Sequence, residues 1–197
     1  MEQLIELDKE LLLYLNSFHT PWLDPVMYFI TKTEAWLPLY LFLLYLVIRE
    51  YKKDCWIVLL GIILTIILAD QITTSIMKPY FARFRPSREP SLQGLVHLVN
   101  GYTGGKYGFA SSHAANTFGT ATFFFLLYRH SKKWIGLLFL WAVIMTYSRI
   151  YLGVHYPGDI LVGGIIGALS GWAGYRFYRW LERTMEKRKA QSTTPSG

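Results

Sequence analysis

The amino-acid sequence predicts an all-α fold, a polytopic transmembrane helical bundle of about five spans preceded by an interfacial amphipathic helix. Hydrophobic residues make up 52% of the 197 positions and charged residues only 17%, whereas a soluble domain of this size carries roughly 25% charged residues. The apolar residues form runs long enough to cross a hydrocarbon core of about 30 Å, and charged loops separate the runs. The chain length favours one domain, which we expect over residues 1–181.

Residues 1–18 predict an amphipathic helix that lies along the membrane interface instead of crossing it. Leucine and aromatic side chains recur there at helical spacing, and Glu2, Glu6 and Glu10 fall on another face of the helix. The segment is too polar and acidic for a cleavable signal peptide. A short segment with two prolines follows and ends the helix.

Five apolar runs predict the membrane spans. They cover residues 26–48, 55–77, 112–128, 134–151 and 159–180. A long polar connection, residues 79–110, joins the second span to the third. Residues 182–197 are charged and then rich in Ser, Thr, Pro and Gly, which predicts a loose basic tail.

The fifth predicted span carries Gly163, Gly167 and Gly171 at four-residue intervals. Small residues at this spacing let helices approach closely in lipid. The favoured interpretation is tight packing within one bundle, and the alternative is a seam between two copies of the chain. The sequence does not predict an oligomeric state.

Basic residues in the short loops predict the orientation of the chain. They form three clusters: Arg49, Lys52 and Lys53; Arg129, Lys132 and Lys133; and Arg183, Lys187, Arg188 and Lys189. All three fall on one side of a five-span bundle, and the positive-inside rule makes that side cytoplasmic. We therefore expect a multi-pass protein of the cytoplasmic (inner) membrane, with the loop 79–110 and the loop before the fifth span on the extracytoplasmic side.

Three polar clusters on the extracytoplasmic side have no explanation in membrane topology. They are KPYFARFRP at residues 78–86, FASSHAAN at residues 109–116 and SRIYLGVHYPGD at residues 148–159. The first two lie at the two ends of the long loop, which is itself basic in spite of the topology rule. This placement predicts that the loop 79–110 contributes to an active site.

The first expected task of these clusters is to bind phosphate. Lys78, Arg85 and Arg149 supply three fixed positive charges, and the two guanidinium groups suit phosphate oxygens. Ser111 and Ser112 begin the third span after a glycine-rich approach. Free N–H groups and the helix dipole make such a helix start a binding site for anions.

His113, His155 and Asp159 add candidate groups for catalysis. Asp159 follows His155 by four residues, so its carboxylate can hold one ring nitrogen and leave the other free to attack phosphorus. Each cluster also has a structural interpretation: snorkelling cations, a serine N-cap or a structural His–Asp hydrogen bond. The three nearby cations disfavour a divalent metal on these residues, and we expect neither a metal nor another cofactor.

The three clusters together resemble the signature of the type 2 phosphatidic acid phosphatase superfamily, which includes the vanadium-dependent haloperoxidases. The first motif reads Lys78, six residues, Arg85 and Pro86, and the third reads Ser148, Arg149, five residues, His155, three residues and Asp159. Both match fully. The second motif is usually Pro-Ser-Gly-His, whereas this chain has Ala110, Ser111, Ser112 and His113. The resemblance covers roughly residues 70–165.

The resemblance implies a metal-independent phosphatase with a phosphohistidine intermediate. His155 would be the nucleophile, Asp159 would orient it, and His113 would protonate the leaving oxygen and later help to activate water. The remaining motif residues would hold the phosphoryl oxygens: Lys78, Arg85, Ser111, Ser112 and Arg149.

The resemblance implies a lipid phosphomonoester or diphosphate in the membrane as the substrate, and no nucleic-acid partner is expected. Undecaprenyl diphosphate is the first substrate we expect, and phosphatidylglycerol phosphate, phosphatidate and the phosphates of lipid A are the alternatives. A lipid-phosphate-binding protein or an anion transporter is the non-enzymatic alternative. Asp70, inside the second span, is expected to have a structural role, and support of the site is the alternative. Arg83 and Arg88 flank the first motif and are candidates to contact a second phosphate or lipid headgroups.

Overall fold

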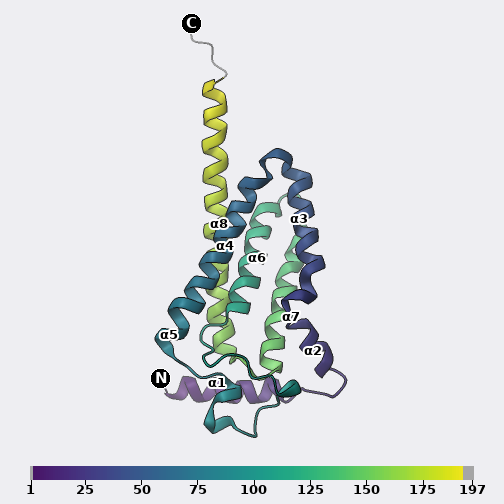
Figure 1. The fold of residues 1–197 in the computed structure, drawn as a ribbon, viewed down its shortest axis with the longest axis vertical. Helices are drawn as coiled ribbons and strands as arrows, with labels where there is room; N and C mark the ends of the chain where they lie inside the picture. The colour runs from purple at the N-terminus through teal and green to yellow at the C-terminus, as the bar shows by residue number, and fades with distance from the viewer. Residues whose placement is uncertain (1, 193–197) are drawn as a thin grey trace.

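The computed structural model describes residues 2–192, and in this range it is a helical bundle with one helix lying across its end (Figure 1). The long helices are α3 (Leu37–Tyr51), α4 (Cys55–Asp70), α6 (Ser112–Tyr128), α7 (Leu137–Tyr151) and α8 (Pro157–Ser192). Helix α1 (Glu2–Asn16) crosses one end, which we call the α1 end. We call the opposite end, where α3 and α4 join at Lys52–Asp54, the hairpin end. The predicted all-α bundle is confirmed.

Three helical segments within residues 2–192 are long and apolar enough to cross a membrane. They are Thr33–Phe81, Lys133–Tyr151 and Pro157–Lys189. The first segment reverses direction at Lys52–Asp54, so α3 and α4 run antiparallel (Figure 1). Helix α6 has 17 residues, which corresponds to about 26 Å of helix, and it packs against α4, α7 and α8. The chain is therefore a multi-pass membrane protein.

The structure divides the first predicted span, residues 26–48, into separate elements. The structure has a short helix α2 (Asp24–Ile30), a 3₁₀ turn (Thr33–Trp36) and then α3. Lys32, between the first two, has an extended backbone with ψ of 132°, so the α-helix cannot continue through it. The break coincides with two charged residues, because Lys32 and Glu34 interrupt the apolar run and both are exposed.

Helix α4 continues into a π-helical stretch, Gln71–Met77, and then into the short helix α5 (Lys78–Phe81). The hydroxyl of Thr73 donates a hydrogen bond of 2.8 Å to the carbonyl of Ala69, one turn back. A π-helical segment rotates the side chains that follow it relative to a regular α-helix, and such segments are frequent at functional sites. The π-helical stretch therefore sets the direction in which the side chain of Lys78 points.

The prediction of a loose tail over residues 182–197 is wrong for the part that the structure describes. Helix α8 runs on to Ser192, well past the predicted end of the fifth span at residue 180. Leu181 and Met185 pack on the hydrophobic core, and Glu182 accepts a 2.5 Å hydrogen bond from Arg179 one turn before it. These contacts extend the helix. Residues 193–197 lie outside the described residues.

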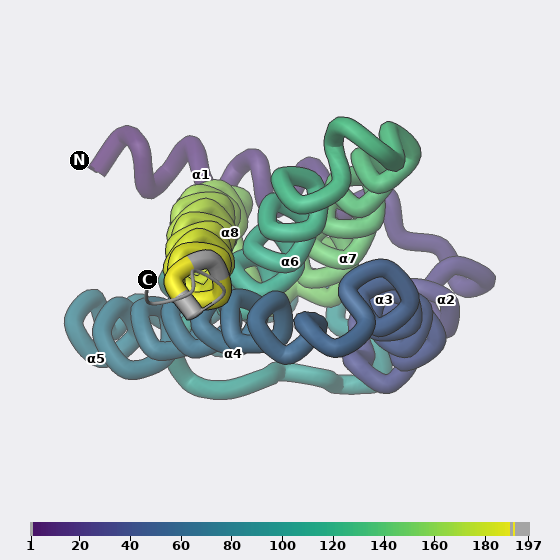
Figure 2. The backbone as a smooth tube through the Cα atoms, turned by 90° about the horizontal axis from the view of Figure 1, so that it is seen from above, coloured from purple at the N-terminus to yellow at the C-terminus, as the bar shows by residue number. Residues whose placement is uncertain are grey.

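The glycines of α8 face its neighbours inside the bundle, as tight packing predicted. Figure 2 shows α8 close to α6 and α4. A Cβ atom on Gly163 would lie 2.5 Å from the carbonyl oxygen of Ser111, and one on Gly167 would overlap the carbonyl oxygen of Ala115. The close contact between α6 and α8 brings the start of α6 against the start of α8, where the second and third polar clusters lie.

Helix α1 is amphipathic as predicted, with its apolar side chains divided between the bundle and the outside. Leu12 is fully buried, whereas Leu4, Leu7 and Tyr14 are exposed. At the end of the helix, the amide of Asn16 donates to the carbonyl of Tyr151 at 2.8 Å, which ties α1 to the end of α7. The location of α1 at a membrane interface stays a prediction.

Candidate active site

The three polar clusters of the sequence meet at the α1 end of the bundle. Each is positioned by a helix terminus: Lys78 by the start of α5, Ser112 and His113 by the first turn of α6, Arg149 by the last turn of α7 and Asp159 by the first turn of α8. His155 lies in the short turn between α7 and α8, and Arg85 lies in the loop after α5. Residues separated by up to 81 positions, from Lys78 to Asp159, thus share one site.

His155 is held between an acid and a cation. Its Nδ1 lies 3.2 Å from Oδ2 of Asp159, and its Nε2 lies 2.8 Å from Nη1 of Arg85. A guanidinium group can only donate hydrogen bonds, so Nε2 must be the acceptor and carry the lone pair. The ring proton is then on Nδ1 and is donated to Asp159. This tautomer leaves Nε2 ready to attack an electrophile.

Burial and the nearby positive charges keep the ring of His155 neutral. Burial, followed by the positive charges of Arg85, Arg149 and Lys78, lowers the pKa of His155 well below the ordinary value of 6.5. Burial and the charge of Arg149 also lower the pKa of Arg85, to about 10, so Arg85 remains a cation at neutral pH. The site therefore combines an unprotonated imidazole with a strongly positive surrounding, as a nucleophile for an anionic group requires.

Asp159 is fully buried, and its two oxygens have separate partners. Oδ2 faces His155 and accepts a 3.1 Å hydrogen bond from the backbone N–H of Tyr156, whereas Oδ1 accepts a 3.1 Å hydrogen bond from Nη1 of Arg83. A Cβ atom on Gly108 would lie 2.9 Å from Oδ2, so the glycine-rich loop before α6 has room for no larger residue there. Arg83 thus binds the catalytic candidate Asp159, a role that the sequence analysis missed.

The two serines of the second cluster differ in their contacts. The hydroxyl of Ser112 accepts from Nζ of Lys78 at 2.7 Å and lies 2.9 Å from the hydroxyl of Thr73. Ser111 is fully buried and caps α6, because its side chain accepts from the N–H of Ala114. Its own backbone N–H donates to the carbonyl of Asp159 at 3.0 Å. In the structure Ser112 therefore joins the cationic site, while Ser111 holds α6 against α8.

Arg149 is almost fully buried and only partly satisfied by the protein. Its Nη1 donates to the hydroxyl of Thr31 at 2.6 Å and its Nη2 to the hydroxyl of Tyr102 at 3.4 Å. Within residues 2–192, the Nε atoms of Arg149 and of Arg85 are buried and have no acceptor. A buried donor without a partner costs about 1–3 kcal/mol, so these two N–H groups favour an anion in the site. Neither Thr31 nor Tyr102 was a candidate, because no sequence pattern connects them to Arg149.

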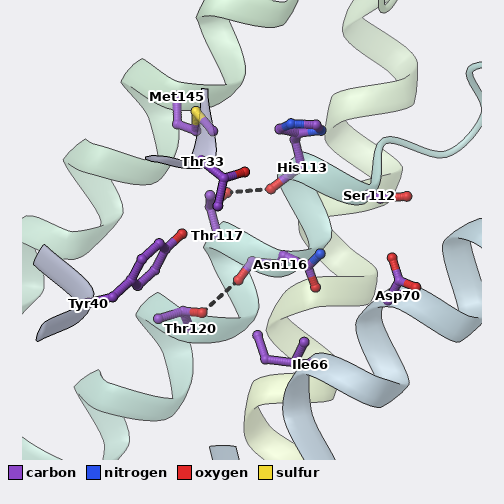
Figure 3. A pocket seen from close by; sticks show the side chains of 10 residues that line it. All are labelled: Thr33, Tyr40, Ile66, Asp70, Ser112, His113, Asn116, Thr117, Thr120 and Met145. Atoms are coloured by element: carbon purple, nitrogen blue, oxygen red, sulfur yellow. Dashed lines mark hydrogen bonds between the residues drawn. The ribbon is translucent and has the colours of Figure 1, made fainter. Parts of the chain in front are cut away.

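A cavity of about 330 Å³ adjoins His113 between α3, α4, α6 and α7 (Figure 3). Most of its lining side chains are polar: Thr33, Tyr40, Asp70, Ser112, His113, Asn116, Thr117 and Thr120, beside Ile66 and Met145. Oδ1 of Asn116 is buried without a hydrogen-bond partner among the described residues. Asp70 accepts a 3.2 Å hydrogen bond from Thr74, whose hydroxyl also lies 3.0 Å from that of Ser112. Asp70 thus lies beneath the cationic site and faces the cavity.

Comparisons with known proteins agree with this arrangement. Residues 56–183 match the profile of the PAP2 superfamily. A protein of Bacteroides thetaiotaomicron named lipid A 4'-phosphatase is 42% identical over 180 residues, which cover 89% of this chain and 78% of that protein. A Sulfolobus acidocaldarius protein named undecaprenyl-diphosphatase is 26% identical over 171 residues, or 85% and 76% of the two chains. The crystal structure of Aquifex aeolicus LpxE superimposes with a TM-score of 0.67 at 29% identity, covering 86% of this chain and 95% of that one.

Proposed function

The chain belongs to the PAP2 superfamily and is a membrane lipid phosphatase, and from this premise we propose that it removes a phosphate from an acylated phosphosugar of the lipid A type. The observation that carries the proposal is the cavity beside His113, on which Asp70 and Asn116 place hydrogen-bond acceptors. If His113 protonates the leaving alcohol, this alcohol must be next to His113, and the cavity is the space beside that residue. Undecaprenyl diphosphate, the substrate expected first from the sequence, becomes the alternative.

The chemistry of the cavity favours a sugar over a prenyl chain as the leaving group. Its volume is at the lower end of the roughly 300–1,000 Å³ that is typical of ligand pockets. Asp70 and Asn116 offer oxygens that accept hydrogen bonds, and the Asn116 oxygen has no partner among the described residues. A hydrocarbon chain would leave the buried Asn116 oxygen unsatisfied, which costs free energy, whereas sugar hydroxyl and amide groups can donate to it and to Asp70. The similarity to a protein named lipid A 4'-phosphatase supports the same choice.

In the proposed first step, Nε2 of His155 attacks phosphorus and the bond from phosphorus to the sugar oxygen breaks. The electron pair of that bond goes to the leaving oxygen. His113 takes up a proton once the negative charge of the bound phosphate offsets the surrounding cations, and it gives this proton to the leaving oxygen. Arg85 donates a hydrogen bond to Nε2 of His155 in the structure. In this step it donates to a phosphoryl oxygen instead. Nδ1 of His155 keeps its proton and donates it in the hydrogen bond to Asp159, whose negative charge balances the positive charge that develops on the ring.

In the proposed second step, water attacks phosphorus and the bond from phosphorus to Nε2 breaks. His113, now without its proton, accepts one from this water, so that each residue returns to its starting state. Lys78, Arg85, Arg149 and the N–H groups at the start of α6 hold the phosphoryl oxygens throughout. Donors fixed in this way contribute about 10²–10³ each to the rate in other enzymes. No step requires a metal ion.

A panel of lipids tests the substrate. Purified protein in detergent with a chelator is expected to release phosphate faster from lipid A than from undecaprenyl diphosphate, phosphatidylglycerol phosphate or phosphatidate. Asn116→Leu is expected to lower kcat/KM for lipid A about tenfold, the equivalent of one to two hydrogen bonds. The same variant should hydrolyse p-nitrophenyl phosphate, which has no sugar, at the wild-type rate. Faster release from undecaprenyl diphosphate, or an equal loss on both substrates, would contradict the proposal.

We propose that the α1 end faces the extracytoplasmic side of the inner membrane. The three basic clusters lie toward the hairpin end, where Lys132 forms an ion pair with Glu50, and such clusters favour the cytoplasmic side. In a Cys55→Ala background, Ser91→Cys is expected to react with a membrane-impermeant maleimide on intact spheroplasts. The matched Lys53→Cys variant should react only after the cells are lysed. The reverse pattern of labelling would overturn this orientation.

A further inference from the structure

The N-terminal helix reaches the active site through one acidic side chain. Oδ2 of Asp8, on α1, lies 2.8 Å from Nη2 of Arg83, and Oδ1 of Asp8 accepts a 2.7 Å hydrogen bond from the backbone N–H of Gly158. Both ionic side chains are largely shielded from solvent, at 15% exposed for Asp8 and 24% for Arg83. Asp8 therefore joins α1, the loop after α5 and the first turn of α8.

Arg83 stands between two carboxylates. Its Nη2 faces Asp8, while its Nη1 lies 3.1 Å from Oδ1 of Asp159. The guanidinium lies over the ring of Tyr156 at 3.8 Å from the ring centroid, which holds its plane in place. The other oxygen of Asp159 faces Nδ1 of His155. The contacts thus form a continuous row from α1 to the proposed nucleophile: Asp8, Arg83, Asp159 and His155.

The first turn of α8 is shaped to receive Asp8. A Cβ atom on Gly158 would lie 2.8 Å from the Asp8 carboxylate, so only glycine leaves room for this contact. The N–H groups at the start of a helix carry a partial positive charge, which favours a carboxylate there. Asp159 is the next residue, so the same turn that binds Asp8 also presents the carboxylate that holds His155.

We propose that Asp8 and Arg83 are positioning residues for the His155–Asp159 pair, and that docking of α1 completes the active site. Arg83 fixes the rotation of the Asp159 carboxylate and compensates its charge, and Asp8 fixes Arg83. Two anchors place α1 itself, namely Asn16 on the end of α7 and Asp8 on the start of α8. The proposal rests on the catalytic role of Asp159 and is independent of which lipid is the substrate.

The test compares kcat and KM of variants on a lipid phosphate that the wild-type protein hydrolyses. Arg83→Gln is expected to lower kcat about 10- to 100-fold, the range found for residues that orient metal ligands through hydrogen bonds, and Asp8→Ala is expected to lower it less. KM should stay within about twofold in both, because Arg83 is paired with Asp8 and Asp159 and neither side chain is among the groups proposed to hold phosphate. Since Asp8 acts through Arg83, the double variant should be no slower than Arg83→Gln alone. Asp8→Glu should recover part of the loss.

Glu10→Ala is the matched control, because it removes an exposed carboxylate from the same helix and is expected to leave kcat unchanged. Thermal unfolding in detergent must show that Asp8→Ala is folded. If Arg83→Gln does not fold, Asp8→Ala alone still tests the proposal. Wild-type kcat in Asp8→Ala, a rise in KM with unchanged kcat, or losses that multiply in the double variant would overturn the proposal. An inactive wild-type protein would instead contradict the proposed function.

Discussion

Replacement of His155 by asparagine is expected to abolish phosphate release from every lipid phosphate, by about 10⁴-fold or more, as for other enzymes that lose their nucleophile. Asparagine keeps a polar side chain of similar reach beside Asp159 and Arg85 but has no nitrogen lone pair for attack on phosphorus. The measurement is phosphate release by the purified variant under conditions in which the wild-type protein is linear with time. Its melting temperature in detergent shows whether the bundle is intact.

The matched control is His130→Asn, at an exposed position near the hairpin end, which is expected to retain wild-type turnover. A folded His155→Asn protein with more than a few per cent of wild-type activity would contradict the nucleophile assignment. Equal losses in the two variants would show that the substitution acts on the fold instead of the chemistry.

The environment of His155 also predicts the effect of acid. Its pKa in the folded protein lies well below 6.5, so the nucleophile stays unprotonated when the pH falls through 6.5. The unfolded chain, in contrast, binds a proton at about pH 6.5. Between these two pKa values the unfolded state binds more protons, so acidification through this window lowers the free energy of unfolding. His155 thus contributes to acid instability before it limits catalysis.

His113→Ala is the second substitution with a large expected effect. His113 lines the cavity proposed for the leaving group, and loss of a positioned acid usually lowers the rate about 10²–10⁴-fold. The loss should be large for a lipid phosphate, whose alkoxide leaving group needs a proton. The loss should be much smaller for the first turnover of p-nitrophenyl phosphate, because the p-nitrophenolate leaving group departs without a proton.

A burst experiment measures the difference. Rapid mixing of His113→Ala with p-nitrophenyl phosphate is expected to give one equivalent of nitrophenol quickly, followed by slow steady-state turnover, because the second step still lacks its base. Thr117→Ala, one turn further along α6 and on the same cavity, serves as the control and should show no such separation. An equal loss with both kinds of leaving group would contradict the role of His113 as the acid.

The sequence was sufficient to predict the helical bundle and the catalytic candidates because both depend on strong local signals. Long apolar runs have no other stable form in lipid than helices, and the three motifs name the residues that the structure brings together at the α1 end. The interior glycine packing of α8 followed from the spacing of Gly163, Gly167 and Gly171 in the same way.

Predictions from the sequence were wrong or missing where contacts between residues far apart in the chain decide the structure. Arg83 looked free to bind a phosphate or a headgroup, but it pairs with Asp8, 75 residues earlier, and with Asp159, 76 residues later. Thr31 holds Arg149 from 118 residues away. The extension of α8 beyond residue 180 depends on the packing of Leu181 and Met185 against the core, which the charged composition of the segment hid.

The roles of Lys78, Ser111 and Ser112 in holding the substrate phosphate stay predictions. Lys78 and Ser112 share a 2.7 Å hydrogen bond in the cationic site, which agrees with a joint phosphate-binding role. Ser111 has a structural task as the cap of α6, so its substitution would also affect the position of His113.

Trapping of the phosphorylated protein tests the central claim most directly. His113→Ala is mixed with ³²P-labelled p-nitrophenyl phosphate, on which its first step stays fast. The mixture is quenched in alkali and digested, and the labelled peptide is identified by mass spectrometry. We predict one acid-labile, alkali-stable phosphate per protein, attached to His155 and missing from His113→Ala combined with His155→Asn. Phosphate on another residue, or phosphate release by the single variant with no labelled protein at any time, would contradict the account.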